Sequence, residues 1–102
     1  MMKKAKLDDE IKIELSEYEI IEKEASKFGN AAHIVLSKDL IGKKVKIITG
    51  KGVKKTENYI IFDLFKTQIF DGEIKSFGTG AHVLIPKEIG KEKIKLLWRK
   101  DE

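Results

Sequence analysis

The chain has 102 residues, of which 41% are hydrophobic and 37% charged, so it is long enough for one small domain with a core and is not disordered by composition. It contains no cysteine, which excludes disulfides, thiolate metal sites and cysteine nucleophiles. The net charge of +4 comes almost entirely from lysine and favours polyanionic partners only modestly, because a solvated lysine surface explains it about as well.

The N-terminal segment, MMKKAKLDDE, has no apolar run after its lysines. We therefore expect neither a signal peptide nor a membrane anchor, and a soluble, cytoplasmic protein. Residues 11–15 then alternate between apolar and charged side chains, which is typical of a half-buried strand. Residues 19–25 predict a weaker second strand.

The next segment predicts a turn, a strand and a helical turn. Phe28-Gly29-Asn30 is a turn signal, since glycine and asparagine tolerate positive φ, and residues 31–36 form an apolar third strand. Ser37 is a suitable N-cap and Gly42 a suitable stop for a single helical turn. Residues 45–48 predict the closing strand, and residues 49–58, rich in glycine and lysine, a linker or an extended hairpin loop.

The chain then repeats this unit at a constant offset of 49 residues, so that residues 11–48 align with residues 60–97 without a gap. The identical pairs are Ile11/Ile60, Leu15/Leu64, Ile20/Ile69, Glu24/Glu73, Phe28/Phe77, Gly29/Gly78, Ala32/Ala81, His33/His82, Lys38/Lys87, Lys44/Lys93 and Lys46/Lys95. One such unit is too short to bury a core alone. We therefore predict a single pseudo-dimeric domain over 1–102, with repeat 1 at 10–48, a linker at 49–58 and repeat 2 at 59–97, related by a pseudo-two-fold axis like a fused homodimer.

Two stretches carry a resemblance to known proteins: KFGNAAHIVLSKD at residues 27–39 and SFGTGAHVLIPKE at residues 76–88. Each resembles the core of the AbrB/MazE-like swapped-hairpin superfamily, and more closely that of small archaeal transposon-encoded proteins. The resemblance implies a mainly β fold with short helical turns, an interlocked β-barrel-like domain, and duplex DNA binding through the loops. The lysine-rich, cysteine-free composition also fits a thermophile.

The resemblance and the charge pattern together give candidate DNA contacts around each predicted loop and helical turn. Asn30 and Thr79 stand at the loop tips, where turn chemistry explains them about as well as DNA contact. Lysine holds phosphates more readily than it reads bases, which favours contact with the DNA backbone over sequence readout. The full set of candidates is Lys27, Asn30, Lys38, Lys43, Lys44, Lys75, Thr79, Lys87, Lys91 and Lys93.

The repeated His33 and His82 are secondary candidates for DNA contact. Two imidazoles are too few for a structural zinc site, so we expect no metal and no cofactor. The histidines either point away from their apolar neighbours or pack at the interface of the two units with a hydrogen bond. Phe28 and Phe77 are predicted to be core residues beneath the loops rather than base-stacking platforms.

The first strands of the two units differ in one respect. Lys12 and Ser16 in the first unit are replaced by Ile61 and Phe65 in the second. The first strand of the second unit is therefore apolar on both faces. Either the linker folds over this strand, or Tyr59, Ile61 and Phe65 form a surface for self-association or a protein partner.

The functional expectation follows from these patterns. The chain has no nucleophile elbow, no phosphate-binding glycine loop and no acid–base pair, so we expect no enzyme and no small-molecule substrate. The leading hypothesis is a small DNA-binding protein, either an AbrB-like transcriptional regulator or a transposon-encoded accessory protein. The alternative is a protein-interaction module, antitoxin-like or transposase-binding, that uses the Tyr59–Phe65 strand.

Overall fold

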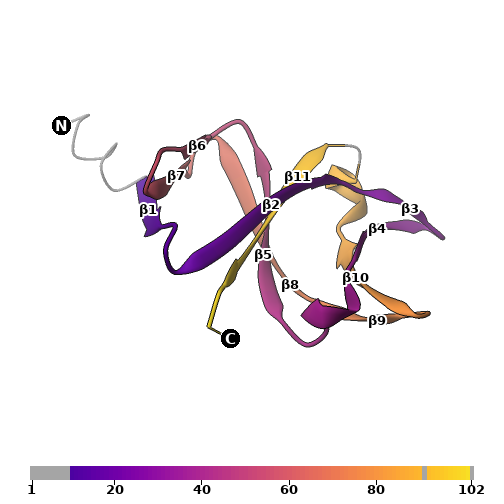
Figure 1. The fold of residues 1–102 in the computed structure, drawn as a ribbon. Coiled ribbons are helices and arrows are strands. Elements are labelled where there is room, and N and C mark those ends of the chain that lie inside the picture. The colour runs from indigo at the N-terminus through magenta and orange to yellow at the C-terminus, as the bar shows by residue number, and fades with distance from the viewer. Residues whose placement is uncertain (1–9, 91, 102) are drawn as a thin grey trace.

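The computed structural model describes residues 10–90 and 92–101 and consists mainly of antiparallel β-strands arranged in three sheets (Figure 1). The sheets follow one another along the molecule, with the four-stranded sheet of β2, β11, β5 and β8 in the middle. Within the described residues, no helix is long and apolar enough to cross a membrane. The coarse prediction of a mainly β fold with short helical turns is confirmed.

The central sheet has the strand order β2-β11-β5-β8, antiparallel throughout. Its strands are β2 (Tyr18–Glu24), β5 (Lys44–Gly50), β8 (Thr67–Glu73) and β11 (Lys93–Arg99). Alternation places Ile47 and Leu96 on one face of the sheet, and Ile48 and Leu97 on the other. All four side chains are buried, because each face of this sheet packs against one of the outer sheets.

The two outer sheets supply the other halves of two hydrophobic cores. One has the order β3-β4-β10-β9, and its strands are β3 (Ser26–Phe28), β4 (Ala31–Leu36), β9 (Lys75–Phe77) and β10 (Gly80–Ile85). Its Ile34 and Val83 pack into the larger core. The other has the order β1-β7-β6, and its strands are β1 (Glu10–Glu14), β6 (Val53–Lys55) and β7 (Tyr59–Asp63). Its Ile60 and Phe62 form the smaller core with Ile48 and Leu97.

The strand pairing follows a two-fold register in all three sheets. In the β4–β10 pair, Ile34 lies opposite Val83, which is the residue 49 positions later. In the β5–β11 pair, Ile47 lies opposite Leu96, again 49 positions later. The same relation holds in the β1–β7 pair, where Lys12 lies opposite Ile61. In each of these strand pairs, one residue therefore lies directly opposite its equivalent, and the other equivalent residues are placed symmetrically on either side of that point.

Two short 3₁₀ turns follow the strands β4 and β10. The first, η1 (Lys38–Leu40), begins after Ser37, whose hydroxyl oxygen accepts a hydrogen bond from the Asp39 N–H at 3.4 Å. The second, η2 (Lys87–Ile89), begins after Pro86 at φ −55°. The predicted N-cap at Ser37 is confirmed, and Gly42, at φ 94°, ends that segment as expected.

The segment 49–58, predicted to be a linker or an extended hairpin loop, contains the end of one strand and all of another. Thr49 and Gly50 extend β5, and β6 pairs with β7 so that Lys54 lies opposite Ile61. This segment therefore lies beside β7, the apolar first strand of the second repeat, while the self-association alternative stays a prediction. It covers one edge of β7, while β1 covers the other.

Candidate nucleic-acid interface

Two hairpins, β3–β4 and β9–β10, extend at the same end of the molecule (Figure 1). Their turns contain Gly29 and Gly78, both at φ 61°, a left-handed conformation that glycine adopts without a steric cost. The candidate contact residues Asn30 and Thr79 follow these glycines and are exposed. The register makes the two tips equivalent positions, so two loops of similar shape are presented together.

Lys38 and Lys87 are the most symmetric of the lysine candidates. Each is the first residue of its 3₁₀ turn, η1 or η2, and both side chains are exposed. They are 49 positions apart and therefore occupy equivalent places in the two repeats. The two lysines, matched in the sequence by the offset of 49 residues, also occupy matching positions in the fold.

Lys27 and Lys75 are not an equivalent pair. Lys27 lies opposite Ala32, whose side chain packs into the core, whereas Lys75 lies opposite His82, on the other face of that sheet. Since cross-strand partners point to the same side, the two lysines lie on opposite faces of their hairpins. The position equivalent to Lys27 is Ser76.

Lys27 instead approaches a lysine of the other repeat. Lys27 and Lys87 line one hollow of about 430 Å³. Glu24 and Glu92 line the same hollow, so this part of the surface carries both signs of charge. A phosphate contact here would compete with local carboxylates.

Lys44 and Lys93 are equivalent residues, and each lies opposite an acid in the central sheet. Lys44 pairs with Glu73, and Lys93 with Glu24. Opposite charges directly across two strands attract one another, which lowers the positive potential that either lysine offers to a polyanion. Lys43 is half-buried, and Lys91 lies outside the described residues.

The two histidines meet at the interface of the repeats. Nδ1 of His33 and Nδ1 of His82 are 2.9 Å apart, so one ring donates a hydrogen bond and the other accepts it. Burial, and then the charge of His33, lower the pKa of His82 below the ordinary imidazole value of 6.5. This agrees with the expectation of a hydrogen bond between the units.

Phe28 and Phe77 differ from their prediction as core residues. Each is 38% exposed, because each lies on the outer face of its sheet and stacks on a histidine. The rings of Phe28 and His33 stack at 4.4 Å between centroids, and those of Phe77 and His82 at 4.5 Å. The outward position follows from strand alternation, which puts the phenylalanines on the histidine side and the apolar β4 and β10 residues on the core side.

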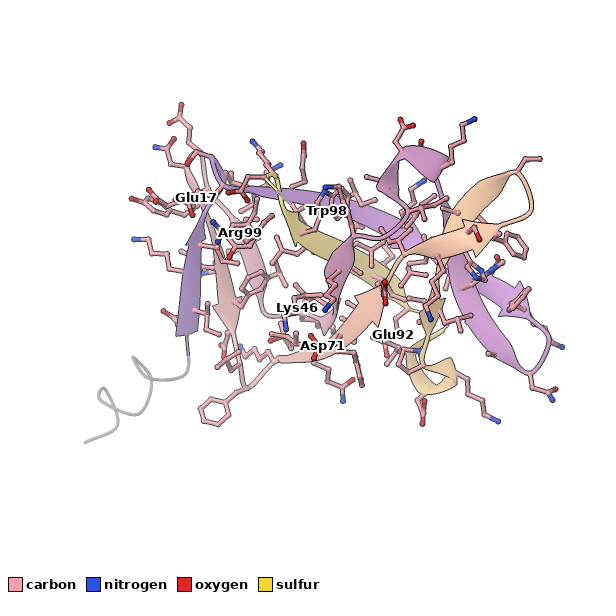
Figure 2. The ribbon with its side chains drawn as sticks, turned by 90° about the horizontal axis from the view of Figure 1, so that it is seen from below. Glu17, Lys46, Asp71, Glu92, Trp98 and Arg99 are labelled. Carbon is pink, nitrogen blue, oxygen red and sulfur yellow. The ribbon has the colours of Figure 1, made fainter. Side chains whose placement is uncertain are left out.

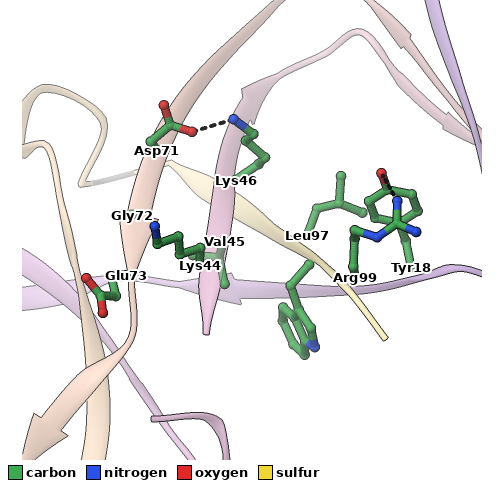
Figure 3. Close-up of a pocket in the computed structure, with 10 residues that line it drawn as sticks. Tyr18, Lys44, Val45, Lys46, Asp71, Gly72, Glu73, Leu97 and Arg99 are labelled. Carbon is green, nitrogen blue, oxygen red and sulfur yellow. Dashed lines mark hydrogen bonds and ion pairs between the residues drawn. The ribbon is translucent and has the colours of Figure 1, made fainter. Parts of the chain in front are cut away.

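A groove of about 620 Å³ beside the central sheet contains residues that the sequence did not single out (Figure 3). Arg99 Nη1 lies 3.3 Å from the Tyr18 hydroxyl, and its guanidinium is 5.3 Å from the centre of that ring. The hydrogen bond to Tyr18, and then the charge of Asp101, raise the pKa of Arg99. Trp98 lines the same groove. The sequence did contain a signal for this groove: Trp98 and Arg99 are the one tryptophan and the one arginine of the chain, and both follow the end of the repeat.

The candidate partner strand lies at the far end of the molecule from the hairpin tips. Ile61 is half-buried between Lys12 and Lys54 in the β1-β7-β6 sheet. Tyr59 is also half-buried, and the ammonium of Lys12 lies 4.2 Å from the centre of its ring. Phe65, in the turn after β7, is 78% exposed. Of the three, Phe65 offers the most apolar surface to solvent.

Comparison of the chain with protein-family models, with curated proteins and with solved structures gave no significant match. Among the described residues, no group of three or more histidine, aspartate and glutamate side chains is placed to hold a metal ion.

Proposed function

We propose that this is a small duplex-DNA-binding protein of the AbrB/MazE swapped-hairpin type, serving as a transcriptional regulator or a transposon-encoded accessory protein. The proposal assigns it no catalytic residue. The observation that carries it is the equivalence of the two hairpin tips and of Lys38 and Lys87, which gives two like-charged sites related by the two-fold register.

Exchange of strands between the repeats supports the swapped-hairpin part of the proposal. β2 of the first repeat pairs with β11 of the second, and β8 of the second repeat pairs with β5 of the first. A homodimer of interlocked hairpins requires this exchange, and fusion of its two subunits would preserve it in one chain. Each repeat is then completed by the other, which accounts for the folding of so short a unit.

The charge chemistry supports backbone contact more than base readout. Two equivalent basic sites suit a duplex, whose phosphates recur on both sides of a local two-fold axis. Lysine neutralises phosphates without the bidentate geometry that arginine offers to guanine. Arg99 is engaged elsewhere, in ion pairs with Glu17 at 3.8 Å and Asp101 at 3.4 Å. Asn30 and Thr79 remain as the side chains at the tips that can reach base edges.

The test is a salt titration of binding to a labelled random-sequence duplex, followed by fluorescence anisotropy. Wild-type affinity is expected to fall linearly with salt on logarithmic axes, since each neutralised phosphate releases counterions. The double variant Lys38→Glu/Lys87→Glu should bind more weakly, with a salt slope smaller by about 2.

A matched control separates a located interface from general charge attraction. Lys54→Glu/Lys55→Glu changes the net charge by the same amount, but at exposed positions of β6 near the other end. The proposal expects this control to keep most of the wild-type affinity. Absence of binding at low salt, or an equal loss in both double variants, would contradict it.

A second candidate, a protein-interaction module, is favoured by the exposure of Phe65. An aromatic side chain that is 78% exposed in a turn contributes little to the stability of the fold, whereas it could fill a pocket of a partner. Sedimentation equilibrium of the wild type and of Phe65→Ser tests the self-association form of this hypothesis. A concentration-dependent mass that Phe65→Ser abolishes would support it; a monomer at all concentrations would remove it.

A further inference from the structure

Four rings from the two hairpins form a closed cluster on the outer face of the β3-β4-β10-β9 sheet. His33 and His82 face one another through Nδ1, with 2.9 Å between the two nitrogens and 83° between the ring planes. Phe28 and Phe77 each stack on one histidine and meet the other edge-on, at 5.4 Å and 5.1 Å between centroids. The two-fold register repeats every contact of this cluster.

The cluster presents two nitrogen donors in apolar surroundings. His33 is 6% exposed and His82 is half-buried. Within the described residues, neither Nε2 atom has a hydrogen-bond partner in the protein, and no carboxylate joins the two imidazoles in a ligand group. The two Nδ1 atoms lie 2.9 Å apart and share one proton, which one ring donates and the other accepts.

That geometry suits a small bridging cation. A hydrogen bond places one proton between two equivalent nitrogens, and a two-coordinate metal ion would lie on the same line. Zinc prefers four ligands, which the cluster does not supply. Copper(I) and silver(I) are filled-shell, monovalent ions that accept two imidazoles in a linear arrangement, and the faces of aromatic rings stabilise a nearby cation.

We propose that His33 and His82 form a two-coordinate site for copper(I), enclosed by Phe28 and Phe77. With bonds of about 2 Å, the Nδ1–Nδ1 distance would widen from 2.9 Å to about 4 Å, which requires the two imidazole rings to move apart by about 1 Å on their paired strands. The site is independent of the proposed DNA-binding function.

The protonation balance of binding is defined by the two rings. With both imidazoles neutral, one carries its proton on Nδ1 and the other on Nε2. On binding, the bridging proton moves to Nε2 of its own ring, so each Nδ1 donates a lone pair and no proton is released. No electron is transferred, because the ion enters and remains as copper(I).

The first test is an anaerobic competition titration of the purified chain against bicinchoninate, a chromophoric chelator of copper(I). The wild type is expected to withdraw one copper(I) per chain from the chelator complex, and His33→Asn/His82→Asn is expected to withdraw none at that stoichiometry. Phe28→Leu keeps both donors and should lower the affinity by about 10-fold, as loss of a surrounding group does in metal sites. Uptake of one copper(I) per chain that persists in the double histidine variant would overturn the proposal, because other donors such as Met1 and Met2 would then hold the ion.

A second measurement uses the wild type alone and does not depend on the variants folding. Silver(I), which has the same coordination preference without redox chemistry, is added to ¹⁵N-labelled protein, and the imidazole nitrogens are followed by NMR. The proposal expects the Nδ1 signals of both histidines to shift together and saturate at one equivalent. Nδ1 signals that do not respond, or a shift at one ring alone, would overturn it.

Discussion

The two outer sheets share the same two-fold register but differ in whether the side chains at equivalent positions are identical. In the β3-β4-β10-β9 sheet, Phe28/Phe77 and His33/His82 are identical at equivalent positions, and each pair makes matching contacts. In the β1-β7-β6 sheet, Lys12 faces Ile61 across the same line, and β6 pairs with β7. The end with the β3-β4-β10-β9 sheet has identical side chains at these equivalent positions and is called the duplicated end. At the other, diverged end, Lys12 and Ile61 differ although they lie directly opposite one another.

This difference separates what the backbone requires from what the side chains do. Antiparallel pairing needs complementary register but not identical residues, so Lys12 and Ile61 can differ without altering the sheet. The contact between two copies of one histidine, in contrast, exists only if both copies keep it. The duplicated end is therefore where both proposed sites lie, while the diverged end can carry an asymmetric surface such as Phe65.

The largest effect should come from one isoleucine that the repeats share but bury differently. Ile60 is fully buried in the smaller core, whereas its equivalent, Ile11, is 44% exposed. Ile60→Ala is expected to lower the free energy of unfolding by about 2–5 kcal/mol, the usual cost of such a cavity. Ile11→Ala, the matched control, should cost well under half of that. Urea denaturation measures both, and equal losses would contradict the assigned burial.

The aromatic residues give the next effect and compare the two ends directly. Phe28→Ala and Phe77→Ala each remove ring contacts of the four-ring cluster, and we expect similar losses of about 1–2 kcal/mol. Phe65→Ala should cost about 0.5 kcal/mol or less, since the ring is mostly in solvent. Thermal unfolding of the three variants checks the order. Unequal losses for Phe28 and Phe77 would show that the cluster is not symmetric.

Acidification should weaken the duplicated end. Because the pKa of His82 is lower in the folded state than the ordinary 6.5, the unfolded chain binds more protons below that pH. The contribution of His82 to the free energy of unfolding is therefore fully present above about pH 6.5. It is lost as the pH is lowered from there toward the folded-state pKa of His82. Lys75 lies opposite His82, and Asp71 and Glu73 line the same hollow, so these are the charged groups that face the ring.

The melting temperature at pH 7.5, 6.5 and 5.5 measures this dependence. His33 and His82 are the two histidines of the chain, so His33→Asn/His82→Asn should remove most of the slope across this interval. A slope that the double variant retains would assign the acid sensitivity to carboxylates instead.

The smallest effect concerns two equivalent ion pairs in the central sheet. Lys46 pairs with Asp71, and Lys95 pairs with Glu22 at 3.4 Å. Figure 2 labels Lys46 and Asp71, and Figure 3 marks the interaction between them. Each should contribute about 0.2–1 kcal/mol, as is usual for partly exposed pairs. The Lys95 pair is less exposed, so double-mutant cycles should give it the larger coupling energy. A larger coupling for Lys46 and Asp71 would contradict this order.

Part of the candidate site followed directly from the sequence. The glycine turns and the cap at Ser37 depend on residues near each other in the chain, and the equivalence of Lys38 and Lys87 depends on the constant offset of the repeat; the structure contains all three. The placement of Lys27 and Lys75 on opposite faces was not anticipated, because the pattern of lysines was compared without the strand register. The stacking of Phe28 on His33 was missed for the same reason.

The sequence by itself determined the repeat, the strand pattern within each unit and the positions of the turns, since alternation, glycine conformation and capping are local properties. Only the tertiary structure decided that β2 pairs with β11 and β8 with β5, that Ile60 is buried while Ile11 is exposed, and that His33 meets His82. These depend on contacts between residues far apart in the chain. Two identical residues can therefore have different surroundings, although the local sequence around each is similar.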